Sequence, residues 1–269
     1  MRSILRYLLL FLAWNILISL VLAISVRLGY ALAGLPLMVA LYGWFLWLLV
    51  LHPRTPAVRW ALLRLRPLDR DALRWTLLGV PVLLVLSWSL GEVYVRLVPV
   101  PPGSFDPFGD LMATPGGRLA ITVLAVGIAP VLEEFFFRGF IQRGLERRFG
   151  AVGGIVTAAV VFAAVHVLPW VLPLHFFLGL AFGYVVWATR SIWSGVILHA
   201  ANNAVAVAGL GFEGEDPTPT PTLWQVGTDV DWWISVAILV VSGLAAALVA
   251  RRLRKAGSER SLRPLPTFG

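Results

Sequence analysis

The sequence contains no cysteine and very little charge. Of its 269 residues, 13% are charged and 59% are hydrophobic, whereas about a quarter of a soluble globular domain is charged. The lack of cysteine excludes disulfides, a thiolate zinc site and a cysteine nucleophile. Several apolar runs of about 20 residues are long enough to cross the roughly 30 Å hydrocarbon core of a bilayer. Together these features predict an integral membrane protein.

Lysine is almost absent as well. Lys255 is the only lysine among 22 basic residues, and the formal net charge is +8. The arginines lie in a few connections and in the tail, which fits membrane orientation rather than nucleic-acid binding, so no nucleic-acid partner is predicted. The arginine-rich composition indicates a GC-rich genome, and we expect a multi-pass protein of a bacterial cytoplasmic membrane.

The apolar runs predict an all-α, polytopic transmembrane helical bundle with about eight spans. The spans are expected at residues 4–24, 30–51, 75–98, 119–141, 152–168, 174–188, 192–211 and 232–250. They divide the chain into N-terminal helices (1–110), a core (111–212), and a last part with an outer loop, the last span and a basic tail (213–269). No segment is expected to form a soluble domain with its own core.

Basic and non-basic connections alternate along this eight-span arrangement. The arginine-rich connections are 52–74, 143–150, the turn at 190 and the tail from 251. The connections without lysine or arginine are 99–117, 168–173 and 211–231. Only Arg27, in the first outer turn, departs from the pattern. Because cytoplasmic loops carry the excess of basic residues, both termini are predicted to be cytoplasmic.

Two adjacent glutamates stand inside the predicted span 119–141, where ionisable groups are costly and usually functional. Glu134 and Arg138 have the i, i+4 spacing of an ion pair on one helix face. Successive helical residues point about 100° apart, so Glu133 is left on a neighbouring face, where it can act as a general base. Pro130 removes the hydrogen bond to the Val126 carbonyl, which predicts a local kink and water access.

Histidine and asparagine occupy two further spans. His166 lies near the end of span 152–168, and His199 and Asn203 are at i and i+4 in span 192–211, so both can face one cavity. Asn202 is expected to point elsewhere. His175, at the outer start of span 174–188, is given little weight.

Counting from the turns predicts the depth of these groups. Glu133 and His166 are equidistant from a turn near Gly150, so two antiparallel helices would place them at one level. His199 is only about eight residues from the next basic turn. The levels agree if the first two helices project about two turns, on the order of 11 Å, beyond that turn. The polar stretch 142–148 fits such a projection, and the site is predicted to open to the cytoplasmic half of the membrane.

A purely structural interpretation is also available for each group. A lone membrane histidine can hydrogen-bond a neighbouring helix, and a glutamate–arginine pair can hold helices together. These polar groups occur together on three helices at compatible depths. Their combination favours a functional site over separate structural roles.

Three motifs resemble those of the CPBP family, which includes the type II (Rce1-like) CAAX prenyl proteases and bacterial Abi proteins. They are Glu133-Glu134-x-x-x-Arg138, Phe162-x-x-x-His166 and His199-x-x-x-Asn203. The resemblance covers about residues 119–211, so the segment 111–212 is expected to be a CPBP-like catalytic core.

The resemblance implies a helical intramembrane endopeptidase with a cytoplasm-facing cavity and a peptide or membrane-protein substrate within the lipid membrane. By position, Glu133 would act as general base on a water, assisted by His166, and His199 with Asn203 would stabilise the oxyanion. The remaining motif residues are expected to shape the site: Glu134, Arg138 and Phe162.

Alternatives to this hypothesis stay open. Glu133, His166 and His199 would supply a two-histidine, one-carboxylate Zn²⁺ site, but the chain has no His-Glu-x-x-His helix, so no cofactor is predicted. A non-enzymatic immunity or scaffold protein is a second alternative. A small transporter or proton channel is a third, which the lack of inverted repeats disfavours.

Overall fold

The chain is helical throughout the part that the structure describes. The computed structural model describes residues 2–28, 30–47, 63–98, 112–166, 169–209, 226–227 and 229–261. In chain order its helices are α1 (Arg2–Arg27), α2 (Ala31–Leu46), α4 (Arg70–Val95), α6 (Pro115–Thr122), η2 (Val123–Ile128), α7 (Ala129–Glu133), η3 (Glu134–Gln142), α8 (Arg143–Ala164), η4 (Pro169–Val171), α9 (Leu172–Thr189), α10 (Ile192–Gly209) and α12 (Val230–Ser261). The predicted all-α class is confirmed.

Five helices are long and apolar enough to cross a membrane. They are Arg70–Val95, Pro115–Ala164, Leu172–Thr189, Ile192–Gly209 and Val230–Ser258. Six of the eight predicted spans lie on these five, because the 50-residue stretch from Pro115 to Ala164 folds back on itself. The first two predicted spans coincide with α1 and α2, whose apolar segments are shorter. The number of spans stays a prediction.

The fold-back occurs at Gly150, close to where the sequence places a turn. Gly150 has φ 72° and ψ 177°, a conformation that glycine adopts without steric cost and that divides α8 into two arms. Phe137 of η3, before this turn, and Phe162 of α8, after it, meet with ring centroids 5.2 Å apart. Gly154 permits the close approach of the arms, since a β-carbon there would overlap the backbone of Glu146.

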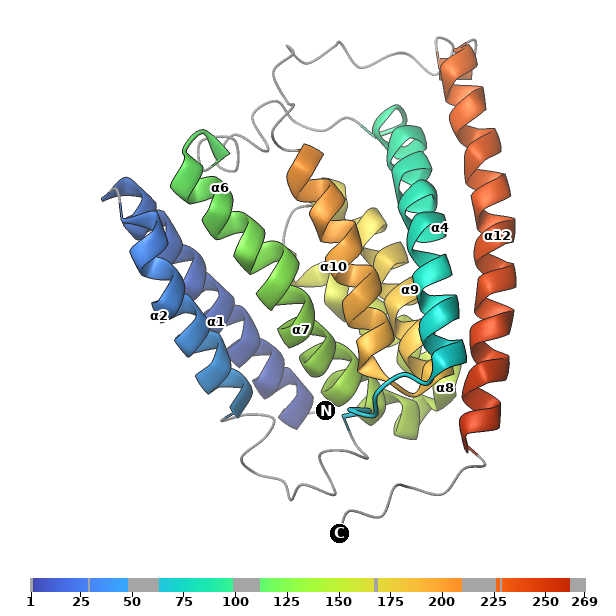
Figure 1. The fold of residues 1–269 in the computed structure, drawn as a ribbon, viewed down its shortest axis with the longest axis horizontal. Coiled ribbons are helices and arrows are strands. Elements are labelled where there is room, and N and C mark those ends of the chain that lie inside the picture. Colours follow the sequence, from blue (N-terminus) through green and yellow to red (C-terminus); the bar gives the residue numbers. More distant parts are fainter. Residues whose placement is uncertain are drawn as a thin grey trace.

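Three of the predicted basic connections meet at one end of the bundle. Arg64 pairs with Glu146 at 2.6 Å, its carbonyl accepts from the Ile192 amide at 2.9 Å, and the Ser191 hydroxyl donates to the Arg66 carbonyl at 2.5 Å. Burial lowers the pKa of Arg64 to about 10, which still leaves it charged near neutral pH. The start of α1 and the end of α12 lie at this same basic end (Figure 1).

At the opposite end, the end of α4 meets the residue just before α12. Arg96, just after α4, forms an ion pair with Glu92 at 2.9 Å and with Asp229, just before α12, at 3.3 Å. The contacts at the two ends therefore agree with the alternation of basic and non-basic connections. Most of the connections 99–117 and 211–231 lies outside the described residues.

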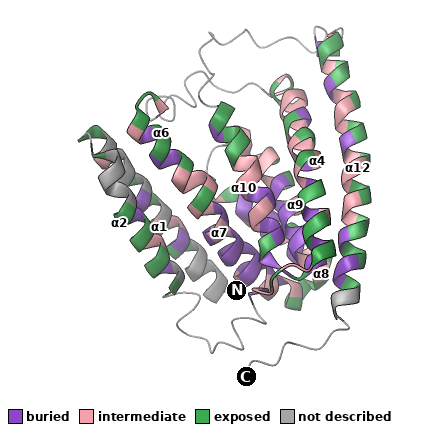
Figure 2. Ribbon diagram, in the orientation of Figure 1, coloured by how far each residue is buried: buried purple, intermediate pink, exposed green. Residues whose placement is uncertain are grey.

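The helices differ in how much surface they bury. Buried residues gather where α7, α9 and α10 meet, while α12 keeps a long exposed apolar face (Figure 2); Val241 and Leu244 on it are 66% and 64% exposed. The α1–α2 pair joins the core through Phe11, whose ring stacks on Phe136 of η3 with centroids 4.4 Å apart. The exposed apolar faces are those expected of helices in contact with lipid.

The ion pair at the basic end generates a stability prediction. Glu146→Gln leaves the Arg64 guanidinium buried without its counter-charge, and we expect a loss of about 3 kcal/mol in unfolding free energy in detergent micelles. Glu92→Gln is the matched control, because Glu92 is 35% exposed and its pair with Arg96 contributes less than about 1 kcal/mol. Equal losses in the two variants would contradict the prediction.

Candidate active site

Glu134 is at the centre of a fully buried ionic network. Its Oε1 lies 2.9 Å from Arg138 NH1 and 3.1 Å from His199 Nδ1, and its side chain has no exposed surface. The predicted i, i+4 pair of Glu134 with Arg138 is therefore present. An ionised carboxylate only accepts hydrogen bonds, so His199 Nδ1 carries a hydrogen and donates it to Glu134.

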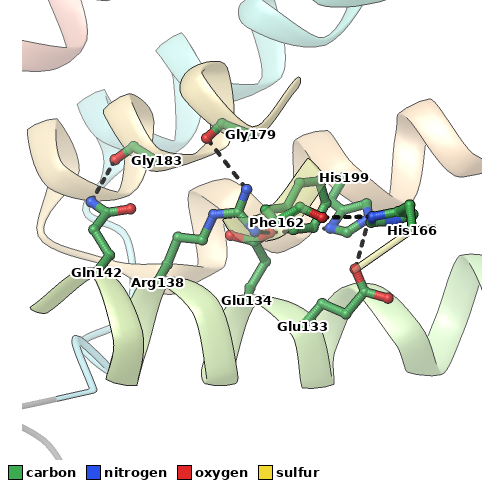
Figure 3. Close-up of polar contacts among 9 residues, drawn as sticks. All are labelled: Glu133, Glu134, Arg138, Gln142, Phe162, His166, Gly179, Gly183 and His199. Carbon is green, nitrogen blue, oxygen red and sulfur yellow. Dashed lines mark hydrogen bonds and ion pairs between the residues drawn. The ribbon is translucent and has the colours of Figure 1, made fainter. Parts of the chain in front are cut away.

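Arg138 connects this network to α9. Its NH2 lies 3.4 Å from the Gly179 carbonyl, which accepts the hydrogen bond. Its guanidinium carbon stands 4.3 Å from the Phe162 ring centroid and 5.4 Å from that of Phe182. Cation–π contacts of this kind stabilise a buried guanidinium. Figure 3 shows Arg138 between the helix that carries Glu134 and the carbonyl of Gly179.

Glu133 occupies the neighbouring helix face, as the sequence predicts. Its Oε2 lies 3.9 Å from His199 Nε2, which is too long for a direct hydrogen bond. His199 therefore lies between the two adjacent carboxylates, with Nδ1 bonded to Glu134 and Nε2 toward Glu133 (Figure 3).

The helix that carries both glutamates is wound as a π-helix on either side of α7. The sequence predicts that Pro130 frees the Val126 carbonyl, which assumes α-helical winding. In the structure the Ala129 amide donates to the Leu124 carbonyl, five residues back. By the same spacing the carbonyl that Pro130 leaves without a backbone donor is that of Ala125, so the predicted acceptor is wrong by one residue. Short π-helical segments often occur at functional sites.

Asn203 compensates for this missing hydrogen bond. Its Nδ2 donates to the Ala125 carbonyl at 2.8 Å. The neighbouring Asn202 points elsewhere, as predicted, and its Oδ1 accepts from the Ser87 hydroxyl at 3.1 Å. Asn203 thus lies against the helix that carries the glutamates, one turn beyond His199.

His166 pairs with His175, which carries little weight in the sequence-based prediction. The rings of His166 and His175 are 3.9 Å apart between centroids. Each Nδ1 is bonded to the carbonyl four residues back, 2.7 Å for His166 and 2.9 Å for His175. Among the described residues no hydrogen bond or ion pair joins His166 to Glu133. The sequence contains a signal for this contact. His166 and His175 are equidistant from the short turn that contains η4, so two antiparallel helices would place them at one level.

Two other contacts of the site were missed. The ring of Phe182 stacks on His199 at 4.7 Å and 18°. Gly195, one turn before His199, has no β-carbon to block the Glu134 carboxylate, which lies against it. Only the close approach of α10 to η3 reveals the need for glycine there.

The predicted projection of the first two helices beyond the next basic turn stays a prediction. Gln142 is fully buried and donates to the Gly183 carbonyl at 3.0 Å, so the stretch 142–148 does not begin as a solvated tail. Glu134 reaches His199, with Oε1 3.1 Å from Nδ1.

The residues proposed as zinc ligands do not form a ligand set. In the part of the chain that the structure describes, no three histidine, aspartate or glutamate side chains converge to hold a metal ion. Glu133 and His199 face each other, but His166 is directed to His175 and Phe162. A three-ligand zinc site is not supported by this geometry, and the cofactor-free hypothesis stays a prediction.

Fold and site together define a helical membrane protein with a buried glutamate–arginine–histidine network near the basic end of its bundle. Residues 115–205, about a third of the chain, match the family described as type II CAAX prenyl endopeptidase, Rce1-like. The match contains all three motifs and confirms the resemblance to the CPBP family of intramembrane proteases. The matching family is described as one of endopeptidases. No curated protein and no solved structure matches the chain.

The contact between Gly195 and Glu134 generates a second prediction. In Gly195→Ala the new methyl group overlaps the Glu134 carboxylate and the Val186 side chain, and we expect a loss of about 1–3 kcal/mol in stability. Gly209→Ala, on the same helix, adds a methyl group that meets nothing within 4 Å. Thermal unfolding in detergent compares the two variants. A Gly195→Ala protein as stable as Gly209→Ala would show that the two helices do not approach this closely.

Proposed function

We propose that the protein is an intramembrane endopeptidase in which Glu133 activates a water molecule without a metal. The position of His199 between Glu133 and Glu134 carries this proposal. A separation of 3.9 Å between Glu133 Oε2 and His199 Nε2 is too long for a direct hydrogen bond, and one water molecule can bridge a polar contact of this length. The water would then face a carboxylate on one side and an oriented imidazole on the other.

Charge balance supports a protonated His199 in this network. With both glutamates ionised, the group holds two negative charges against the one positive charge of Arg138, and buried charges are stable only when they are paired. An imidazolium at His199 makes the group neutral and leaves Nε2 as a donor. This arrangement resembles the base-and-orienter pairing of hydrolases, with Glu134 fixing the ring of His199.

The proposed reaction keeps that balance. Glu133 takes a proton from the water as its oxygen attacks the peptide carbonyl, so the network gains one positive charge while the substrate gains an oxyanion. His199 Nε2–H donates to that oxyanion. Glu133 then gives its proton to the leaving nitrogen, the peptide bond breaks, and the starting charges return. His166, with a neutral ring, can accept a hydrogen bond from the water, as the motif predicts.

We further propose that the site opens to the cytoplasm. Gly195 and His199 lie within the first two turns of α10, about 11 Å from the basic end. Basic connections mark the cytoplasmic side of a membrane protein. Glu133 also keeps 17% of its side chain exposed, whereas Glu134 has none.

The substrate is proposed only as a class. The matching family is described by its CAAX prenyl substrates, and a site near the membrane boundary suits the end of a peptide chain held in the membrane. A bacterial cytoplasmic membrane is the expected location. There, membrane-bound peptides without a prenyl group would be the substrates.

Glu133→Gln tests the mechanism. The variant should keep the thermal stability of the wild type, because no direct hydrogen bond to Glu133 is lost, while cleavage falls at least about 10²-fold. Quantitative mapping of new N-termini in membranes that contain the wild-type or the Glu133→Gln protein identifies the substrate. A peptide of the mapped site then gives the rates, with Glu92→Gln as a control glutamate outside the site.

The same experiment separates the alternatives. Wild-type cleavage by Glu133→Gln would overturn the proposal. A biological effect that persists in this variant without any cleavage would favour the immunity or scaffold alternative. Proton flux into liposomes that Glu133→Gln abolishes would favour a transporter.

Two roles for Asn203 can be distinguished by experiment. The motif implies that its amide stabilises the oxyanion, whereas the structure has it donate to the Ala125 carbonyl. We propose that Asn203 acts through the Ala125 carbonyl and positions the glutamate helix. Asn203→Ala should lose cleavage, and Pro130→Ala should restore part of it, because residue 130 then has a backbone N–H for Ala125. The cleavage rate of the double variant Asn203→Ala, Pro130→Ala is compared with that of Pro130→Ala alone. No recovery would assign the Asn203 amide to the oxyanion instead.

A further inference from the structure

An apolar groove lies between α4, α9 and α12. Leu198 of α10, next to His199 of the candidate site, also lines it. The volume of the groove is about 300 Å³, and its lining includes Gly79, Leu83, Leu198 and Leu253. The polar group in the lining is the hydroxyl of Tyr184, which donates to the Ala250 carbonyl at 3.2 Å. With that hydroxyl already bonded, the lining suits an apolar ligand.

The groove runs parallel to the helices. Its lining extends from Gly79 to Leu86 on α4 and from Leu253 back to Ala246 on the antiparallel α12, a length of about 10 Å. Since α4 begins and α12 ends at the basic end, Gly79 and Leu253 mark the end of the groove nearest to that membrane face (Figure 1).

Guanidinium groups surround this end of the groove. Arg252 lies 5.5 Å from the Trp75 ring centroid, and Arg74 lies 6.0 Å from the same ring. Arg254 lies 5.6 Å from the ring of Trp187. All three arginines are exposed, and the described residues provide them with no carboxylate ion-pair partner.

We propose that the groove binds one acyl chain of an anionic phospholipid of the surrounding membrane. The phosphate would lie at Arg252 and Arg254, on either side of Leu253, and the chain would follow the groove toward Leu86. Charge complementarity selects the headgroup, and the apolar lining selects the chain. Because Leu198 lines the groove and His199 belongs to the site, the bound chain supports the helix that carries His199. The proposal does not depend on the endopeptidase function.

Native mass spectrometry of the full chain in non-ionic detergent tests this site. The delipidated protein is titrated with phosphatidylglycerol or with phosphatidylcholine that has the same acyl chains. We expect one phosphatidylglycerol to bind more tightly than phosphatidylcholine. Arg252→Gln combined with Arg254→Gln should weaken phosphatidylglycerol roughly 30-fold. Arg251→Gln is the control, since Arg251 is exposed on the same helix without a contact to the groove or its aromatic rings.

A second variant examines the chain-binding part. Gly79→Leu fills the groove, since a β-carbon there already lies 3.3 Å from Val249, and it should weaken both lipids. Gly91→Leu is its control, because a β-carbon at Gly91 meets nothing within 4 Å. The arginine variants keep the test valid if Gly79→Leu does not fold. Equal binding of the two lipids, or unchanged binding in the arginine variants, would overturn the proposal. So would displacement of phosphatidylglycerol by a farnesylated peptide at lower concentration, which would assign the groove to substrate.

Discussion

The fold depends on neutralising one carboxylate that has been removed from water. A buried, unpaired Glu134 would be unstable, so the chain must bring Arg138 and His199 to it. Arg138 comes from the same helix, one turn away. His199 comes from α10, and the two helices can meet only because Gly195 lacks a side chain at the contact. This requirement fixes the distance between η3 and α10 and thereby sets His199 in front of Glu133.

The same network explains why two adjacent glutamates have different environments. Glu134 is enclosed by Arg138, His199 and the backbone of α10, whereas Glu133 remains partly exposed on the next helix face. The π-helical winding beside α7 changes which carbonyl Pro130 leaves without a backbone donor. Asn203 satisfies that carbonyl from α10, so one helix supplies both the imidazole between the glutamates and the amide that holds their helix.

Electrostatics also organises the two ends of the bundle. The basic connections meet through Arg64 and Glu146, and at the other end Arg96 after α4 pairs with Asp229 before α12. The site lies close to the basic end, and the apolar groove begins at the arginines of that end. A position near the membrane boundary would give the proposed hydrolytic site access to water, while its buried surroundings strengthen interactions among its charges.

The sequence by itself determined the all-α membrane class, the turn at Gly150, and the ion pair between Glu134 and Arg138, because hydropathy, glycine and i, i+4 spacing are local properties. It also identified the three motifs that the family match contains. Only the tertiary structure decided that His199 bonds to Glu134 and that His175 lies against His166. The same holds for Gly195, which has to be glycine, and for the Ala125 carbonyl, which needs Asn203. These depend on which faces of distant helices meet and on π-helical winding, and neither follows from spacing along one helix.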